Sequence, residues 1–167
     1  NWSDVARIGA DYFETRELGP TALALADRIA AEHVTFEARM LAAIRFVQDD
    51  IRYQAVTLGA GGWVPRDPET ILATRYGDCK DKSLLIKLFA RYFGAEASAA
   101  AFVHSTDTYT LPADLPRLTR FNHAIAWFEK GGKTYWVDGT QRHQGGTLDT
   151  MTQPYYGHAL LLRSGVT

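Results

Sequence analysis

The order of hydrophobic and polar residues in the first third of the chain is typical of amphipathic helices. Apolar residues recur three or four positions apart from Ser3 to Tyr12, from about Thr21 to Ala31 and from Thr35 to Ile51. Ser3 and Thr35 are residue types that cap helix N-termini. We therefore predict three helices, whose apolar faces belong to the core.

The helical pattern stops between Tyr53 and Arg66, where glycines, Trp63 and a proline predict a loop. Asp67 followed by Pro68 predicts the start of a short helix, which we expect to end at Gly77. A further apolar repeat predicts a helix that begins near Cys79 and ends at Gly94.

Strand patterns fill the second half of the chain. We predict strands at Ala97–Val103 and Ala159–Arg163, and a loop from Thr106 to Arg120. Two more strand candidates, Asn122–Glu129 and Lys133–Asp138, flank the turn signal Lys130-Gly131-Gly132 and predict a hairpin. Helices first and strands later predict an α+β domain with an antiparallel sheet.

The amino-acid composition limits the classes of protein to which this chain can belong. The chain has 167 residues, a formal net charge of −1 and 22% charged residues, which fits one globular domain spanning 1–167. The absence of a basic run argues against nucleic-acid binding, and no apolar run reaches the length of a membrane span, so we expect no membrane contact by this domain. The first residue is Asn1, so we expect a domain excised from a longer protein.

Cys79 is the one cysteine in the chain, so no internal disulfide forms. At a predicted helix start, backbone N–H groups and the helix dipole favour the thiolate, the nucleophilic form. Lys80 and Lys82 add positive charge nearby, whereas Asp78 and Asp81 act in the opposite direction. The alternative is a buried structural cysteine, and a partner base is needed to decide between the two.

The predicted hairpin supplies such a base. If Gly131-Gly132 is a two-residue turn, Lys130 pairs with Lys133, and His123 lies diagonal to Asp138 on one face of the hairpin. Asp138 then orients the imidazole and leaves its other nitrogen for a reactant. The alternatives are a strand histidine without a chemical role and a turn aspartate. We expect the other histidines to be surface residues: His33, His104, His143 and His158.

Three ordered motifs resemble those of bacterial transglutaminase-like proteins, in particular the branch whose core follows a domain of unknown function, DUF3857. These motifs are Arg75-Tyr76-Gly77-Asp78-Cys79-Lys80-Asp81, Phe121-Asn122-His123-Ala124 and Tyr135-Trp136-Val137-Asp138-Gly139-Thr140. Ile51-Arg52-Tyr53 and Gly61-Gly62-Trp63-Val64-Pro65 also fit that branch. Gly139 stands where the branch more often has proline. The resemblance extends from about Ser3 to Leu162.

The resemblance implies a papain-like core, in which a cysteine at the start of a central helix packs on a sheet that carries histidine and aspartate. It implies Cys79 as nucleophile, His123 as general base and then acid, and Asp138 as the residue that orients His123. The backbone N–H of Cys79 and the side chain of Gln54 are candidate oxyanion donors. Trp63 is a candidate cleft wall, with simple packing as the alternative.

The activity expected from the resemblance is acyl transfer at a peptide or protein amide through a thioester on Cys79, without a cofactor or metal. The acceptor, water for a peptidase or amidase and an amine for a transglutaminase, stays open. The alternatives are a catalytically silent binding or structural module and, with less support, a metal site, because no CxxC or HExxH spacing is present. Relatives in this branch are often exported or membrane-tethered, which favours a periplasmic or extracytoplasmic location.

Overall fold

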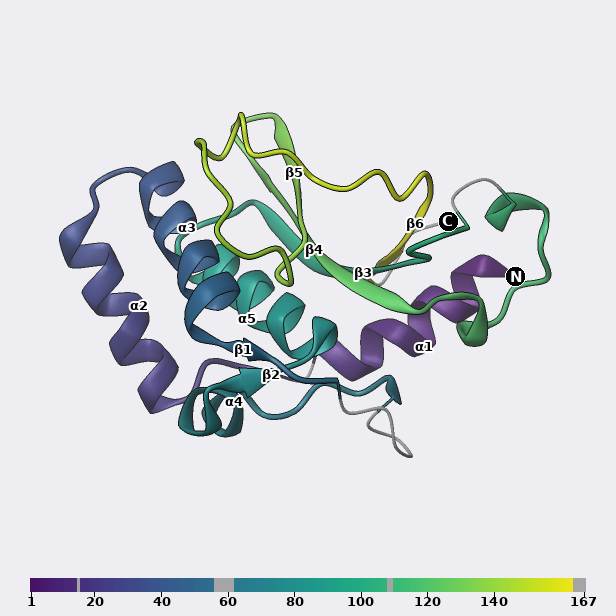
Figure 1. The fold of residues 1–167 in the computed structure, drawn as a ribbon, viewed down its shortest axis with the longest axis horizontal. Coiled ribbons are helices and arrows are strands. Elements are labelled where there is room, and N and C mark those ends of the chain that lie inside the picture. The colour runs from purple at the N-terminus through teal and green to yellow at the C-terminus, as the bar shows by residue number, and fades with distance from the viewer. Residues whose placement is uncertain (15, 56–61, 108–109, 164–167) are drawn as a thin grey trace.

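The computed structural model describes residues 1–14, 16–55, 62–107 and 110–163. Helices and short helical turns make up most of the first half of the chain, and strands most of the second (Figure 1). The helices are α1 (Trp2–Glu14), α2 (Pro20–Glu32), α3 (Phe36–Arg45), the π-helical turn Phe46–Asp50, α4 (Pro68–Thr74), α5 (Cys79–Tyr92) and two 3₁₀ turns, Leu111–Ala113 and Leu118–Arg120. The strands are β1 (Arg52–Tyr53), β2 (Tyr76–Gly77), β3 (Ala97–Val103), β4 (His123–Lys130), β5 (Lys133–Val137) and β6 (Ala159–Leu162).

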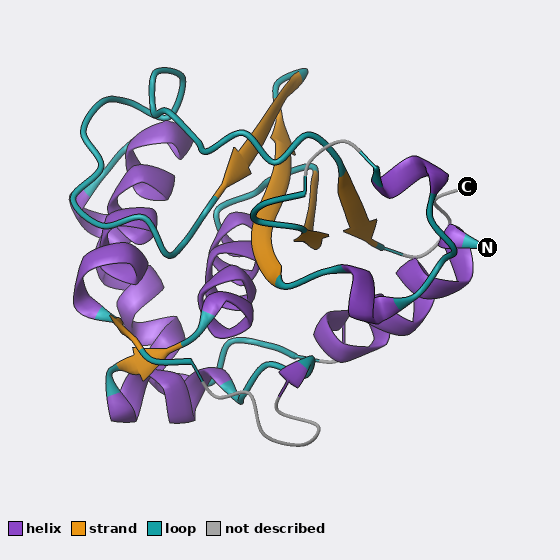
Figure 2. Ribbon diagram, turned by 45° about the vertical axis from the view of Figure 1, so that its right-hand side comes forward, coloured by secondary structure: helices purple, strands orange, loops and turns teal. Residues whose placement is uncertain are grey.

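The main sheet has four antiparallel strands in the order β5-β4-β3-β6. Helix α5 packs across β3 and β4, and α3 packs against α5. Helix α1 covers β6 and the adjoining part of β3 (Figure 1). Figure 2 shows the sheet on one side of α5 and the other helices around it. The predicted α+β class is therefore confirmed, and α5 is the central helix.

The core lies between α5 and the sheet. Phe89 and Ile86 of α5 are fully buried in one apolar cluster with Ala126 and Phe128 of β4. Leu84, on another face of α5, joins a second cluster that contains the buried aromatic rings of Phe13 and Phe102. Burial of apolar surface on two sides of α5 fixes its position, and with it the position of the residues at its first turn.

The β4–β5 hairpin has the predicted register. Lys130 pairs with Lys133, and Ala126 pairs with Val137. Gly131 and Gly132 have φ angles of 59° and 73°, a left-handed conformation that glycine adopts without steric cost and that a two-residue turn requires.

One sequence prediction about the segment before Cys79 was wrong, and one pair of strands was missed. Helix α4 ends at Thr74 and not at Gly77, because Arg75 adopts a left-handed conformation with φ 55° and closes the helix. The following residues, Tyr76–Gly77, form β2, which pairs in parallel with β1. This two-stranded unit was not predicted, since strands of two residues carry no alternating pattern.

None of the helices in the described ranges has both the length and the hydropathy needed to cross a membrane.

Candidate active site

Asp138 follows the last residue of β5, and hydrogen bonds hold both its backbone N–H and its backbone carbonyl. Its backbone N–H donates to Gln153 Oε1 at 2.8 Å, and its backbone carbonyl accepts from Gln48 Nε2 at 2.9 Å. Carboxylate Oδ1 accepts from the backbone N–H and the hydroxyl of Thr140, at 2.8 and 2.7 Å. The side chain is only 1% exposed. A buried carboxylate held by this many donors stays ionised and keeps one orientation.

His123 begins β4 and contacts the other carboxylate oxygen of Asp138. The distance from His123 Nε2 to Asp138 Oδ2 is 3.0 Å. This is the contact that the hairpin register predicts for two residues on one face. The imidazole is 13% exposed, so Asp138 fixes its orientation while part of the ring remains accessible.

Both members of this pair have pKa values that favour their charged forms. Burial opposes the charge on His123, but hydrogen bonds to Asp138 and Cys79 and their negative charges outweigh burial and raise the pKa of His123 to about 9. Burial likewise opposes the charge on Asp138, yet His123, Tyr156 and Thr140 hold the pKa of Asp138 well below its usual range. An imidazolium and a carboxylate therefore coexist at neutral pH.

Cys79 is the first residue of α5, and its position depends on a well-formed helix start. The Asp78 carboxylate accepts from the backbone N–H of Lys80 at 3.1 Å, and the Asp81 carboxylate accepts from the backbone N–H of Asp78 at 3.3 Å. The backbone N–H of Asp81 also donates to the Asp78 carboxylate at 3.4 Å, and this reciprocal pair of bonds between Asp78 and Asp81 is a capping box. Arg66 donates to Asp81 through its backbone N–H and its Nε, at 2.8 and 2.9 Å, and so ties the preceding loop to this turn.

The two lysines next to Cys79 bind other groups. Lys80 forms an ion pair with Asp78, and both side chains are buried. Lys82 is fully buried, and its Nζ donates to the backbone carbonyls of Val47 and Gln48 at 2.9 and 3.2 Å. Burial lowers the pKa of Lys82 to about 8. Both lysines are therefore engaged by groups other than the thiol: Lys80 is paired with Asp78, and Lys82 binds two carbonyls of the π-helical turn.

Cys79 and His123 line the same cavity. It has a volume of about 310 Å³ and is bounded by Gly62, Trp63, Cys79, Lys80, Phe102, Phe121, Asn122, His123 and Ala124. Cys79 is half-buried. The structure therefore brings together the three residues of the predicted triad: Cys79 and His123 at one cavity, and His123 on Asp138.

The two candidate cleft residues lie in different places. Trp63 lines the cavity, and its ring meets that of Phe102 edge-on with a centroid distance of 5.5 Å. Gln54 follows β1 and is exposed, and its backbone N–H donates to the carbonyl of Gly77 at 3.1 Å. This bond places the backbone of Gln54 beside Gly77 of β2, which lies two residues before Cys79 in the sequence.

None of the remaining histidines lines the cavity with Cys79, although His143 Nδ1 lies 3.6 Å from Asp49 Oδ1. His143 and His158 are exposed, as expected, whereas His33 and His104 are half-buried. His104 Nδ1 accepts from the backbone N–H of Asp107 at 2.9 Å and so closes a loop. Among the residues that the structure describes, no group of three or more His, Cys, Asp or Glu side chains could hold a metal ion.

Four partners of Asp138 were missed by the sequence reasoning: Gln48, Gln141, Gln153 and Tyr156. Gln141 Nε2 and the Tyr156 hydroxyl both donate to Asp138 Oδ2, at 3.1 and 2.5 Å. Gln141 lies three residues after Asp138, so a local contact was foreseeable. Gln153 and Tyr156 lie in a segment without regular secondary structure, and neither periodicity nor spacing marks such a contact.

No family model matches the sequence, and no curated protein matches it. Solved structures do. A "putative protease" from Parabacteroides distasonis aligns over 94% of this chain with a TM-score of 0.68 and 13% identity. A "putative cysteine protease" from Cytophaga hutchinsonii aligns over 80% of this chain with a TM-score of 0.50 and 14% identity.

This chain spans 31% of the length of the first of these proteins and 42% of the second. At such low identity the likeness shows the fold, and the fold is the α+β, papain-like one predicted from the sequence. The chain thus shares its architecture with proteins described as proteases, and it carries a cysteine at the start of the central helix beside a histidine and an aspartate on the sheet.

Proposed function

We propose that this domain catalyses acyl transfer at an amide bond of a peptide or protein, through a thioester on Cys79. The observation that carries the proposal is one cavity lined by both Cys79 and His123, with His123 hydrogen-bonded to the buried carboxylate of Asp138. This is the nucleophile, base and orienting group of a cysteine hydrolase or acyltransferase. The three sequence motifs favour the transglutaminase-like branch.

In the first half of the reaction, the Cys79 thiolate attacks the amide carbonyl carbon, and a C–S bond forms as the carbonyl electrons move to oxygen. Because the pKa of His123 is about 9, the imidazole carries a proton at neutral pH. His123 gives this proton to the leaving nitrogen when the C–N bond breaks. The amine departs, and the acyl group remains on Cys79 as a thioester.

In the second half, His123 is neutral and acts as a base. It takes a proton from water or from an acceptor amine, whose oxygen or nitrogen attacks the thioester carbonyl. The C–S bond then breaks and restores the thiolate. Asp138 keeps the imidazole in one orientation and stabilises its charge in both steps.

The negative charge on the carbonyl oxygen needs hydrogen-bond donors. The backbone N–H of Cys79, in the first turn of α5, is the first candidate, because N–H groups in the first turn of a helix lack partners within the helix. The Gln54 side chain is the second candidate, since its backbone lies beside β2. Gln54→Ala would then lower kcat by about 10²-fold, the effect of losing one such donor.

Alkylation of Cys79 tests the proposal directly, since the chain has one cysteine and labelling is unambiguous. An ordinary thiol with a pKa of about 8.5 is only about 1% ionised at about pH 6.5. We expect iodoacetamide to label the protein at this pH at least about tenfold faster than it labels a free cysteine. We also expect His123→Ala to remove the acceleration.

Peptide amides, supplied with and without an amine, then show which acceptor is used. A hydrolysed product indicates water, and a transamidated product indicates the amine. Cys79→Ala is the control and should release no product. A labelling rate that follows free cysteine at every pH, together with no turnover, would show a catalytically silent module.

A further inference from the structure

Apart from the reacting groups, most of the side chains that line the cavity beside Cys79 are apolar, and Lys80 and Asn122 are its polar members. Trp63, Phe102, Phe121 and Ala124 form the apolar walls. Phe102, Phe121 and Ala124 are 1 to 3% exposed, so their positions are fixed by the core. The Phe102 ring contacts Trp63 and Phe121, with centroid distances of 5.5 and 6.0 Å.

Charged groups at the described walls of this cavity are already paired. Lys80 forms its ion pair with the buried Asp78 carboxylate, and His123 is bonded to Asp138. A charged substrate side chain entering here would lose its hydration without gaining a partner, which is costly. An apolar side chain would instead exchange water for aromatic surface.

We propose that this cavity binds an apolar side chain of the substrate next to the amide that Cys79 attacks, and that Trp63 and Ala124 set the size it accepts. The proposal rests on the proposed acyl-transfer function and specifies its substrate. The cavity volume of about 310 Å³ exceeds the ~150 Å³ that suffices for a benzene molecule in a protein core. Leucine- or phenylalanine-sized groups therefore fit.

A panel of peptide amides that differ only in the residue beside the scissile bond tests this proposal. We expect peptides with leucine or phenylalanine at this position to have a kcat/KM about 10- to 100-fold higher than peptides with glycine, aspartate or lysine. Trp63→Ala should lower kcat/KM for the apolar substrates and leave glycine nearly unchanged, because it removes one wall. Ala124→Leu should narrow the cavity and penalise phenylalanine most. Trp136→Ala, at an exposed position outside this cavity, is the control.

The outcomes distinguish this proposal from the proposed function. If Cys79 is labelled rapidly by iodoacetamide but all substrates react alike, or charged ones react best, the apolar subsite is refuted and the acyl-transfer function stands. If rapid labelling is absent, both fail. Thermal melting of each variant identifies a loss of fold. Because Trp63→Ala enlarges the cavity and Ala124→Leu narrows it, the test stays informative when one of the two variants is unstable.

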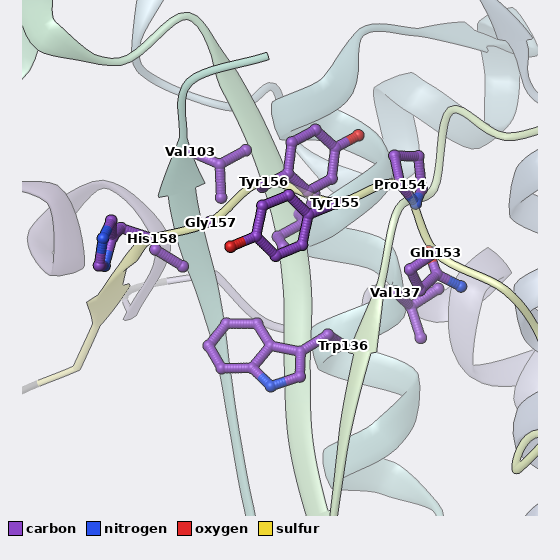
Figure 3. A pocket seen from close by; sticks show the side chains of 11 residues that line it. Val103, Trp136, Val137, Gln153, Pro154, Tyr155, Tyr156, Gly157 and His158 are labelled. Atoms are coloured by element: carbon purple, nitrogen blue, oxygen red, sulfur yellow. The ribbon is translucent and has the colours of Figure 1, made fainter. Parts of the chain in front are cut away.

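A second inference rests on a different contact, that of Tyr156 with Asp138. The Tyr156 hydroxyl donates to Asp138 Oδ2 at 2.5 Å, and its ring centroid lies 5.6 Å from that of His123. Tyr156 belongs to the wall of a separate cavity of about 500 Å³ on the sheet face away from α5, together with Trp136 and Tyr155 (Figure 3). It therefore separates this second cavity from the His123–Asp138 pair.

Tyr156 competes with His123 for the same oxygen. Asp138 Oδ2 accepts from His123, Gln141 and Tyr156, so each donor takes a share of its negative charge. Burial and the bond to Asp138 raise the pKa of Tyr156 far above its usual value, so the hydroxyl keeps its proton and donates to Asp138 at neutral pH. The contact limits both the rotation of the carboxylate and the strength of its bond to His123.

The geometry points to Tyr156 as a positioning residue of the triad, acting on His123 through Asp138. Tyr156→Phe removes the hydroxyl and keeps the ring against His123. Without this donor, fewer hydrogen bonds share the negative charge of Asp138 Oδ2, and its attraction to the imidazolium is stronger. The pKa of His123 should therefore rise further by several tenths of a unit or more. The kcat value should fall by about 3- to 10-fold at nearly constant KM.

NMR titration of the His123 ring is the decisive measurement, because it needs no substrate and so does not depend on the proposed function. Tyr155→Phe is the matched control: Tyr155 is 72% exposed and lines the same cavity, and its change should leave the titration of His123 unaltered. A His123 titration in Tyr156→Phe that overlays the wild-type curve, in a protein with unchanged melting temperature, would overturn the positioning role.

Discussion

His123 stands between two acidic partners, and this position decides its charge. Asp138 is nearly inaccessible and fully hydrogen-bonded, whereas Cys79 is half-buried and can be approached from the cavity. Each partner raises the pKa of His123 against the effect of burial. The imidazole thus links the buried carboxylate of Asp138 to the accessible thiol of Cys79.

Cys79→Ala should therefore lower the pKa of His123. The substitution removes a hydrogen bond and a negative charge, both of which raise this pKa, and leaves burial opposed by Asp138 alone. The shift is measured by NMR titration of the imidazole. Cys79→Ser, which keeps a hydrogen-bonding group without an ionised thiol, should give a smaller decrease. An unchanged titration in Cys79→Ala would show that the thiol and the imidazole do not interact.

At the scale of elements, the site depends on how the end of β5 docks on α5. Gly139 follows Asp138, and a Cβ atom added there would lie 2.9 Å from Lys82 Cβ and 3.1 Å from Ile86 Cδ1. Real Cβ atoms essentially never show the first of these contacts, and the second is tighter than most contacts that they make. A residue with a side chain at this position would push the Asp138 segment away from α5.

Gly139→Ala should accordingly destabilise the protein by about 1–3 kcal/mol, the usual effect of overpacking. It should also slow the labelling of Cys79 by displacing Asp138. Gly145→Ala is the control, because an added Cβ there meets nothing within 4 Å. Urea denaturation compares the two free energies of unfolding. Equal values for both variants would contradict the close approach of β5 and α5.

Sequence patterns predicted these elements well where the signal was local. The turn at Gly131-Gly132 set the hairpin register, and the register placed His123 diagonal to Asp138. Strand β3 and the N-cap at Asp67 were also predicted correctly. The left-handed Arg75 and the partner Tyr156 were not, because the first is a single-residue backbone choice and the second is a contact between distant segments.

For the molecule as a whole, the His123–Asp138 pair makes the free energy of unfolding depend on pH in two ranges. Asp138 has a lowered pKa in the folded state, so its contribution to stability is present above its unfolded pKa of about 3.9 and is lost as the pH falls below it. His123 has a raised pKa, so its contribution is full below about 6.5 and is lost as the pH rises through about 9.

The difference in stability between the wild type and His123→Gln should thus be largest between about pH 4 and 6.5 and decline on both sides. Urea denaturation across this range measures it. His143→Gln is the control, because His143 is exposed, and its difference from the wild type should stay small at all pH values. A constant difference for His123→Gln would show that the ion pair makes no contribution to folding.

Cys79 lies on α5, whereas His123 and Asp138 lie on the sheet, and this division has a consequence for when the site forms during synthesis. The contact between His123 and Asp138 joins residues 15 apart within one hairpin, whereas Cys79 reaches them only when α5 packs on the completed sheet. On the ribosome, α5 emerges before the hairpin has been made, so its thiol is at first no more reactive than that of any cysteine. Under the proposed function, activation of the Cys79 thiol therefore requires the folded chain.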